Sequence, residues 1–146
     1  MPGHGSRVRL DQVVVGLDDS AISERVAAWS AKLCKALGAA ATILHCIDPG
    51  AEHSVERLDE ITTRSQLSFE KESCAVFRGL KVDHQPVVEN GDPRICLIET
   101  AERQEAGLIV VGQRGSGQFS GLGGTASYLV RHSPLPLAVI PPPPNQ

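Results

Sequence analysis

The apolar residues of this chain fall into short continuous runs, separated by longer stretches in which apolar residues recur at steps of three and four. The short runs are rich in Val, Ile and Leu and predict strands that are buried on both faces. The longer stretches predict amphipathic helices. The continuous runs predict strands at 12–17, 41–47, 108–112 and 135–140, and an alternating pattern predicts one more at 81–88. The expected helices are about 20–37, 52–77, 95–105 and 125–132.

Turn and cap residues mark the ends of the first helix. Ser20, which follows a pair of aspartates, is the expected N-cap. Gly38 stands where a left-handed C-cap is expected. The apolar stripe between them is Ile22, Val26, Leu33 and Leu37, with either Trp29 or Ser30 facing the same way.

Strands and helices alternate without an internal repeat or linker, which is typical of an α/β domain. We expect one open, parallel, five-stranded sheet of order 3-2-1-4-5 with helices on both faces, in the Rossmann-like class. Residues 10–140 form this domain, between an N-terminal tail, 1–9, and a proline-rich tail, 141–146. Ligands of such sheets bind at the carboxyl ends of the strands, where the strand order reverses.

Composition excludes several classes of protein. The chain has 146 residues, a net charge of −3, 41% hydrophobic and 21% charged residues, which is typical of a soluble globular protein. It lacks both the ~20-residue apolar run of a membrane span and an apolar signal-peptide core, so we expect a cytoplasmic protein with no membrane partner. The negative charge and 3% aromatic content argue against nucleic-acid binding. The four cysteines are isolated, which argues against disulfide and metal frameworks.

The C-terminal part of the chain differs in charge from the rest. Residues 106–146 contain Arg114 and Arg131 but no Asp or Glu, so they carry +2, and the preceding residues carry −3 − 2 = −5. This stretch also holds six glycines between Gly112 and Gly124, followed by Thr125 and Ser127. Accessible backbone N–H groups, hydroxyls and a following helix N-terminus together favour a phosphate site. The alternative is a surface linker between a strand and a helix.

Two common phosphate motifs do not fit this segment. A Walker A motif is excluded because no Gly-Lys-Ser/Thr occurs. The GxGxxA match at 121–126 neither follows a strand directly nor precedes the acidic residue expected about 20 positions later.

The motifs together resemble the universal stress protein family over almost the whole chain. Gly112-Gln-Arg-Gly115 and Gly124-Thr125 are similar to the two halves of the family's ATP-binding motif, with eight intervening residues where nine are usual. The similarity extends to the first strand with its Asp18-Asp-Ser turn, to the segments 44–49 and 91–93, and to the closing segment 133–140.

This resemblance implies an ATP-binding, stress-response regulatory protein whose nucleotide orders the glycine-rich loop, with Mg²⁺ bound through the phosphates. Gly16 and Asp18 would lie near the adenine and ribose, and Cys46 near the adenine. The phosphates would bind at Gly112, Arg114, Gly115, Gly124 and Thr125, with Ser127 assisting. The resemblance also implies a homodimer through the last strand, 135–140, which is an apolar edge.

Several of these residues have simpler interpretations. Asp18 is also a candidate cap of the first helix. Cys46 is also a small buried apolar group, and His45 is expected to be a hydrogen-bonded core histidine. No catalytic constellation is visible, so the chemistry extends at most to slow ATP hydrolysis or to an enzyme acting on another adenylate. The shortened loop keeps open a nucleotide-free, dimeric interaction module of the same family.

Overall fold

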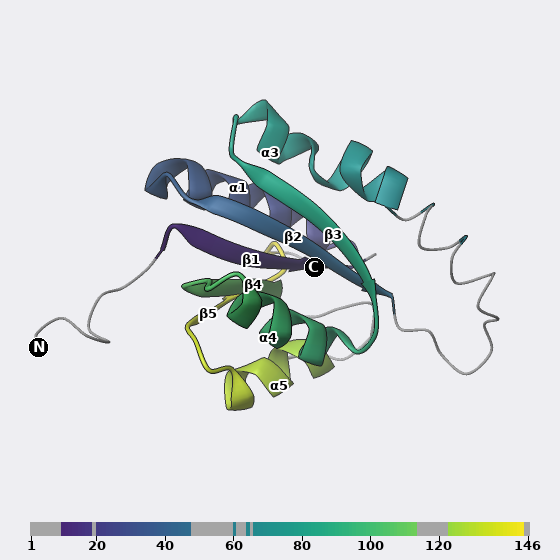
Figure 1. The fold of residues 1–146 in the computed structure, drawn as a ribbon, viewed down its shortest axis with the longest axis vertical. Coiled ribbons are helices and arrows are strands. Elements are labelled where there is room, and N and C mark those ends of the chain that lie inside the picture. The colour runs from purple at the N-terminus through teal and green to yellow at the C-terminus, as the bar shows by residue number, and fades with distance from the viewer. Residues whose placement is uncertain are drawn as a thin grey trace, which may run out of the picture.

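Five strands form one sheet in the computed structural model, which describes residues 10–18, 20–47, 60, 64, 66–113 and 123–144 (Figure 1). The strand order is β3-β2-β1-β4-β5, and every neighbouring pair is parallel. The expected fold class is therefore confirmed. The strands are β1 (Gln12–Leu17), β2 (Ala40–Ile47), β3 (His84–Asn90), β4 (Leu108–Gly112) and β5 (Leu137–Ile140).

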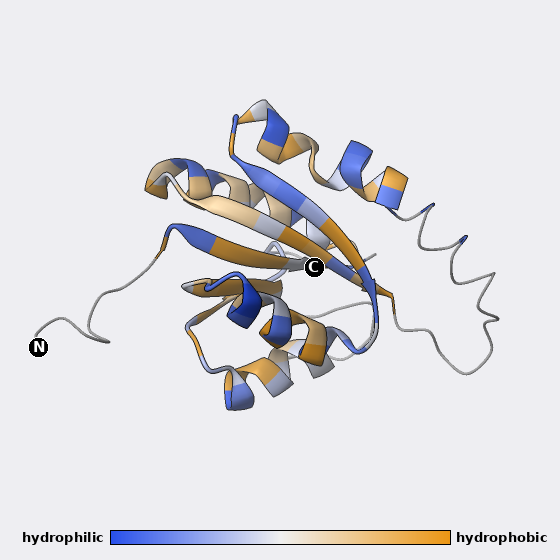
Figure 2. Ribbon diagram, viewed as in Figure 1, coloured by the Kyte–Doolittle hydropathy of each residue, from blue (hydrophilic) through white to orange (hydrophobic). Residues whose placement is uncertain are grey.

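Helices cover both faces of the sheet. One face packs against α1 (Ser23–Leu37), the π-helix η1 (Phe69–Ser73) and α3 (Ala75–Gly79), and the other against α4 (Pro93–Arg103) and α5 (Gly124–His132). Strand β1 lies at the centre: Val13 and Val15 point to one layer and Val14 to the other, and all three are 0% exposed. Figure 2 shows apolar residues along β1 and polar residues over the first half of the edge strand β3.

Helix α1 begins two residues later than its expected N-cap at Ser20 implies. Its N-cap position is Ile22, and no side chain caps it. The N–H of Ser20 instead donates to the Asp18 carboxylate, so the expected cap residue belongs to the preceding turn. Ser30, not Trp29, faces the core, because Ser30 is 0% and Trp29 41% exposed. The helix ends as predicted at Gly38, whose φ of 67° is left-handed.

The long helix expected over 52–77 is interrupted within its described part. Residues 66–68 are helical and lead into η1, and α3 follows only after Cys74. The Cys74 N–H donates to the carbonyl of Phe69, a five-residue step that widens one turn. Phe69, Cys74 and Phe77 are all buried in the core. The widened turn thus puts all three on the sheet side.

Local hydrogen bonds set the remaining boundaries. Asp92 caps α4 by accepting from the N–H of Arg94 at 2.9 Å, and the Arg94 guanidinium lowers the pKa of the Asp92 carboxyl. The last strand begins two residues later than expected because Ser133 Oγ binds the carbonyl of Leu135 at 2.7 Å, which holds that residue in a turn. No helix among the described residues has both the length and the apolarity to span a bilayer.

Candidate functional site

A cavity of about 420 Å³ opens at the carboxyl ends of β1 and β4, where the strand order reverses. This is the edge of the sheet at which the fold class predicts a ligand. Its lining comes from β1, β2 and β4, the first turns of α1, α4 and α5, and the segments beside them. The lining residues are Gly16, Leu17, Asp18, Ile22, Ser23, Val26, Leu44, Cys46, Pro93, Leu97, Val111, Gly112, Gly123, Gly124, Thr125 and Ala126.

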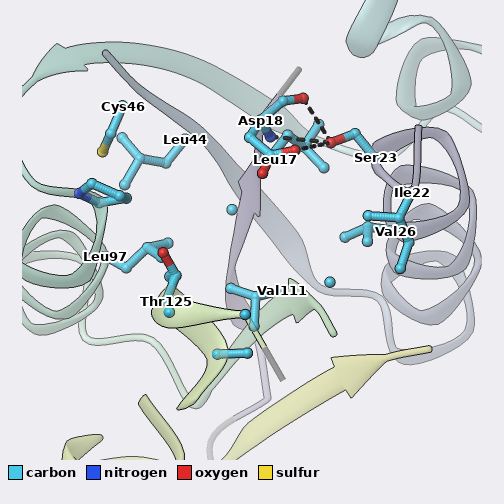
Figure 3. A pocket seen from close by; sticks show the side chains of 16 residues that line it. Leu17, Asp18, Ile22, Ser23, Val26, Leu44, Cys46, Leu97, Val111 and Thr125 are labelled. Carbon is cyan, nitrogen blue, oxygen red and sulfur yellow. Dashed lines mark hydrogen bonds between the residues drawn. The ribbon is translucent and has the colours of Figure 1, made fainter. Parts of the chain in front are cut away.

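The walls of the cavity are mainly apolar. Ile22 and Val26 face it from α1, and Leu44 and Leu97 face it from β2 and α4 (Figure 3). Gly16 sets the space between them, since a Cβ at this position would lie 2.8 Å from Cδ2 of Leu97. A glycine at the end of β1 therefore lets the Leu97 side chain of α4 lie close against the strand. A flat aromatic base fits such walls better than a polar group does.

Asp18 and Ser23 form a polar corner at the end of β1. The Asp18 Oδ1 atom accepts from the Ser20 N–H at 2.8 Å and lies 3.0 Å from Ser23 Oγ. Ser23 Oγ in turn donates to the Asp18 carbonyl at 2.7 Å and accepts from its N–H at 3.1 Å. These bonds hold the carboxylate at the rim of the cavity (Figure 3). Asp18 therefore does not cap α1, whose N-cap position is Ile22; its carboxylate orders the turn before the helix and borders the cavity.

His45 and Cys46 lie at the end of β2 but have different surroundings. His45 Nδ1 donates to the Leu17 carbonyl at 3.1 Å, and its ring packs near that of Phe69. His45 is therefore hydrogen-bonded as expected, but it is only partly buried and lies outside the buried core. Cys46 faces the cavity, and burial, a hydrogen bond with Cys96 and nearby carboxylates raise the pKa of its thiol.

The N-terminus of α5 closes the far side of the cavity with main-chain donors. The Gly123 N–H donates to the Gln113 carbonyl at 2.7 Å, so the two ends of the glycine-rich segment meet here. The Ser127 N–H makes the first intrahelical bond, to Gly123, which leaves the amides of 124–126 without a partner inside the helix. No acidic residue occurs in this first turn. The helix start therefore offers donors and a favourable dipole to an anion.

The structure brings together most of the site residues predicted from sequence. The predicted residues that line the cavity are Gly16, Asp18, Cys46, Gly112, Gly124 and Thr125. Ser127 lies one turn further along α5 and does not line it. Arg114 and Gly115 lie outside the described residues. The apolar lining, including Ile22, Leu44 and Leu97, was not predicted as part of a site, because helix and strand periodicity marks these residues only as buried.

Comparisons with known proteins agree with this architecture. A family model described as "Universal stress protein family" matches residues 10–141. No curated protein matches the chain in sequence. Among solved structures, universal stress protein UspA from Lactobacillus plantarum is similar, with a TM-score of 0.77 and 23% identity over 92% of this chain and 99% of that one.

Two further similar structures contain adenine nucleotides. A universal stress protein in complex with cAMP has a TM-score of 0.71 and 23% identity, over 90% of this chain and 96% of that one. The universal stress protein from Archaeoglobus fulgidus in complex with dAMP has a TM-score of 0.68 and 20% identity, over 92% of this chain and 99% of that one. At these identities the structural matches show a shared fold.

Proposed function

This chain belongs to the universal stress protein family, and from that premise we propose that it is a cytoplasmic, ATP-binding regulatory protein with the nucleotide in the cavity at the ends of β1 and β4. One observation carries the proposal: a mainly apolar cavity ends on the α5 amides that have no partner inside the helix, where both ends of the glycine-rich segment meet. An adenylate matches this arrangement, because it has a flat base at one end and an anionic phosphate at the other. The cAMP and dAMP complexes of similar proteins support an adenine nucleotide.

The residues that line the cavity indicate where the base, the ribose and the phosphates of the nucleotide would bind. The base lies between the α1 side, Ile22 and Val26, and the opposite side, Leu44 and Leu97. The ribose hydroxyls donate to the Asp18 carboxylate, whose orientation the Ser20 amide and the Ser23 hydroxyl already hold. The phosphates accept from the backbone of Gly112 and the 124–126 amides, with the hydroxyl of Thr125 beside them.

A magnesium ion would be held through the phosphates. Over the described residues, no three His, Cys, Asp or Glu side chains lie together as a ready set of metal ligands. The described lining contains a single carboxylate, Asp18, and its Oδ1 is engaged by Ser20 and Ser23. We therefore assign Asp18 a role in binding the nucleotide. We also propose that the bound nucleotide orders the segment 112–124 and that the ordered segment presents a surface to partners.

Nucleotide binding is tested by calorimetry with a sugar-specific control. We expect Asp18→Asn to weaken Mg-ATP binding about tenfold or more, because a hydrogen bond to a charged group contributes ~1.5–3 kcal/mol. The same substitution should leave the affinity for 2′,3′-dideoxy-ATP nearly unchanged, since that nucleotide has no ribose hydroxyl to donate.

Asp83→Asn is the matched control. The substitution makes the same change in charge, and Asp83 precedes β3 at the opposite end of the sheet from the cavity. An equal loss for both nucleotides in Asp18→Asn would contradict the ribose contact. Absence of heat and of thermal stabilisation at millimolar Mg-ATP would refute the ATP proposal and leave the nucleotide-free dimeric module.

We also propose that two copies pair through the edge strand β5. Its residues Leu137–Ile140 are all apolar, whereas the other edge, β3, contains Pro86 and polar residues that disfavour pairing. The carbonyls of Pro136 and Ile140 accept from Ile109 of β4 and from Gln113 directly after it, so by alternation the N–H of Val139 faces the open edge. Light scattering should show a dimer at micromolar concentration and a monomer for Val139→Pro, with similar thermal unfolding. A wild-type monomer would contradict the pairing.

A further inference from the structure

A second groove lies between α1 and the end of β5. Its volume is about 300 Å³, and it shares no lining residue with the cavity at the ends of β1 and β4. The lining residues are Arg25, Ala28, Trp29 and Lys32 of α1, Ile140 of β5, and Pro141 directly after it. The groove is therefore a separate feature of the surface, which the proposed nucleotide site does not use.

The middle of this groove is apolar and includes an exposed aromatic side chain. Ile140 is buried, whereas Trp29 is 41% exposed. Pro141, which also lines the groove, begins a run of four prolines. A groove that contains an exposed aromatic side chain is the surface on which ligands in the polyproline II (PPII) conformation pack their proline rings.

Two cations flank Trp29 on the same face of α1. Arg25, Trp29 and Lys32 follow one another at steps of four and three, so they lie along one side of the helix. Both cations are exposed, and neither forms an ion pair or hydrogen bond with another residue that the structure describes. None of the lining residues is acidic, and residues 106–146, which supply the β5 side, contain no Asp or Glu. The groove therefore favours an anionic ligand in a chain whose net charge is −3.

The spacing of the two cations indicates the shape of that ligand. Because Arg25 and Lys32 lie two helical turns apart, their Cα atoms are separated by ~10.5 Å along the axis of α1. In a PPII segment, residues i and i+3 lie on the same side and are ~9 Å apart, which matches this separation. In an extended strand, residues i and i+3 point to opposite sides. An α-helix with its side chains is ~10 Å wide, which is too wide to enter a groove of this volume.

We propose that this groove binds an acidic, proline-rich segment of a partner protein in the PPII conformation, with two acidic residues three positions apart. The two carboxylates pair with Arg25 and Lys32, and the proline rings between them pack on Trp29. A PPII segment is already extended and rigid before it binds, so a short segment loses little conformational entropy. The proposal requires no nucleotide, so its test is independent of the proposed ATP site.

Tryptophan fluorescence tests the proposal on the full chain, because Trp29 is the only tryptophan in it. The probe is the peptide acetyl-Pro-Glu-Pro-Pro-Glu-Pro-amide, titrated to millimolar concentration at low ionic strength. We expect a saturable change in the emission of Trp29. One control peptide has Gln in place of both Glu, and the other, acetyl-Pro-Glu-Pro-Glu-Pro-Pro-amide, has the same composition with the acids two positions apart. Both controls should bind at least about twofold more weakly, because each loses one or both ion pairs.

Substitutions of the two cations identify the groove as the binding site. Arg25→Gln and Lys32→Gln should each weaken binding of the first peptide about two- to fivefold and leave binding of the Gln peptide unchanged. Lys35→Gln is the matched control, because Lys35 is exposed in α1 but does not line the groove. No response to the first peptide, equal binding of all three peptides, or an equal loss in Lys35→Gln would overturn the proposal. A change in Trp29 emission on raising the protein concentration alone, or a stronger response to oligouridylate, would overturn it in favour of a second copy of this chain or of RNA.

Discussion

Replacing Gly16 by alanine is expected to lower the free energy of unfolding by about 1–3 kcal/mol and to weaken ATP binding by about 10- to 100-fold. The added methyl would lie 2.8 Å from Cδ2 and 3.2 Å from Cδ1 of Leu97, and 3.3 Å from Cγ1 of Val111. Because Gly16 and both neighbours line the cavity, the displaced side chains move into the space that we assign to adenine. Denaturant unfolding and ATP calorimetry measure the two effects.

A double-mutant cycle shows whether Leu97 is the source of this strain. Leu97→Ala alone should cost about 2–5 kcal/mol, because Leu97 is 2% exposed. In Gly16→Ala/Leu97→Ala the new methyl has room, so the double variant should be more stable than the sum of the single losses predicts. Strictly additive losses, within about 0.5 kcal/mol, would contradict the clash. Gly79→Ala is the control, since a Cβ there meets no atom within 4 Å.

Replacing Ser30 by alanine is expected to raise the free energy of unfolding by about 1–2 kcal/mol, an unusual outcome for a fully buried position. Ser30 is 0% exposed in α1, and its Oγ has no hydrogen-bond partner among the residues that the structure describes. Alanine removes the unpaired hydroxyl and is also the better helix former.

Ser68→Ala is the matched control, because Ser68 is an exposed helical serine whose substitution changes only helix propensity. Chemical denaturation of both variants isolates the contribution of burial. A loss of stability in Ser30→Ala would mean that the hydroxyl is bonded in solution.

Local sequence predicted the sheet well because its central strands are continuous apolar runs. The predicted ranges of β1 and β4 agree with the structure, since each run ends directly at polar or glycine residues. The start of α1 was predicted wrongly because Asp18 binds the N–H of the expected cap, Ser20. The π-turn of η1 was missed because it follows from packing Phe69 and Cys74 onto the same core, which a pattern with a fixed helical period does not contain.

The polar part of the candidate site was predicted better than its apolar part. Asp18, Gly112 and Thr125 follow strands or begin a helix in the expected fold, and strand topology alone gathers them at one edge. Leu97 and Ile22 look like ordinary core residues in the sequence, because burial in a core and burial in a pocket wall require the same side chains. Only the folded chain shows that Gly16 leaves a space between them.

The pairing of β1 with β4 joins an early segment of the chain to a late one. As the protein leaves the ribosome, β2 can pair with β1 and β3 can pair with β2 as soon as each strand has emerged. The cavity is complete only after Val111 and Thr125 have emerged. Under the proposed function, a nascent chain cannot bind nucleotide until β4 and the start of α5 have emerged. A nucleotide bound in this cavity would then stabilise folded molecules by mass action and contribute nothing to the earliest steps of their folding.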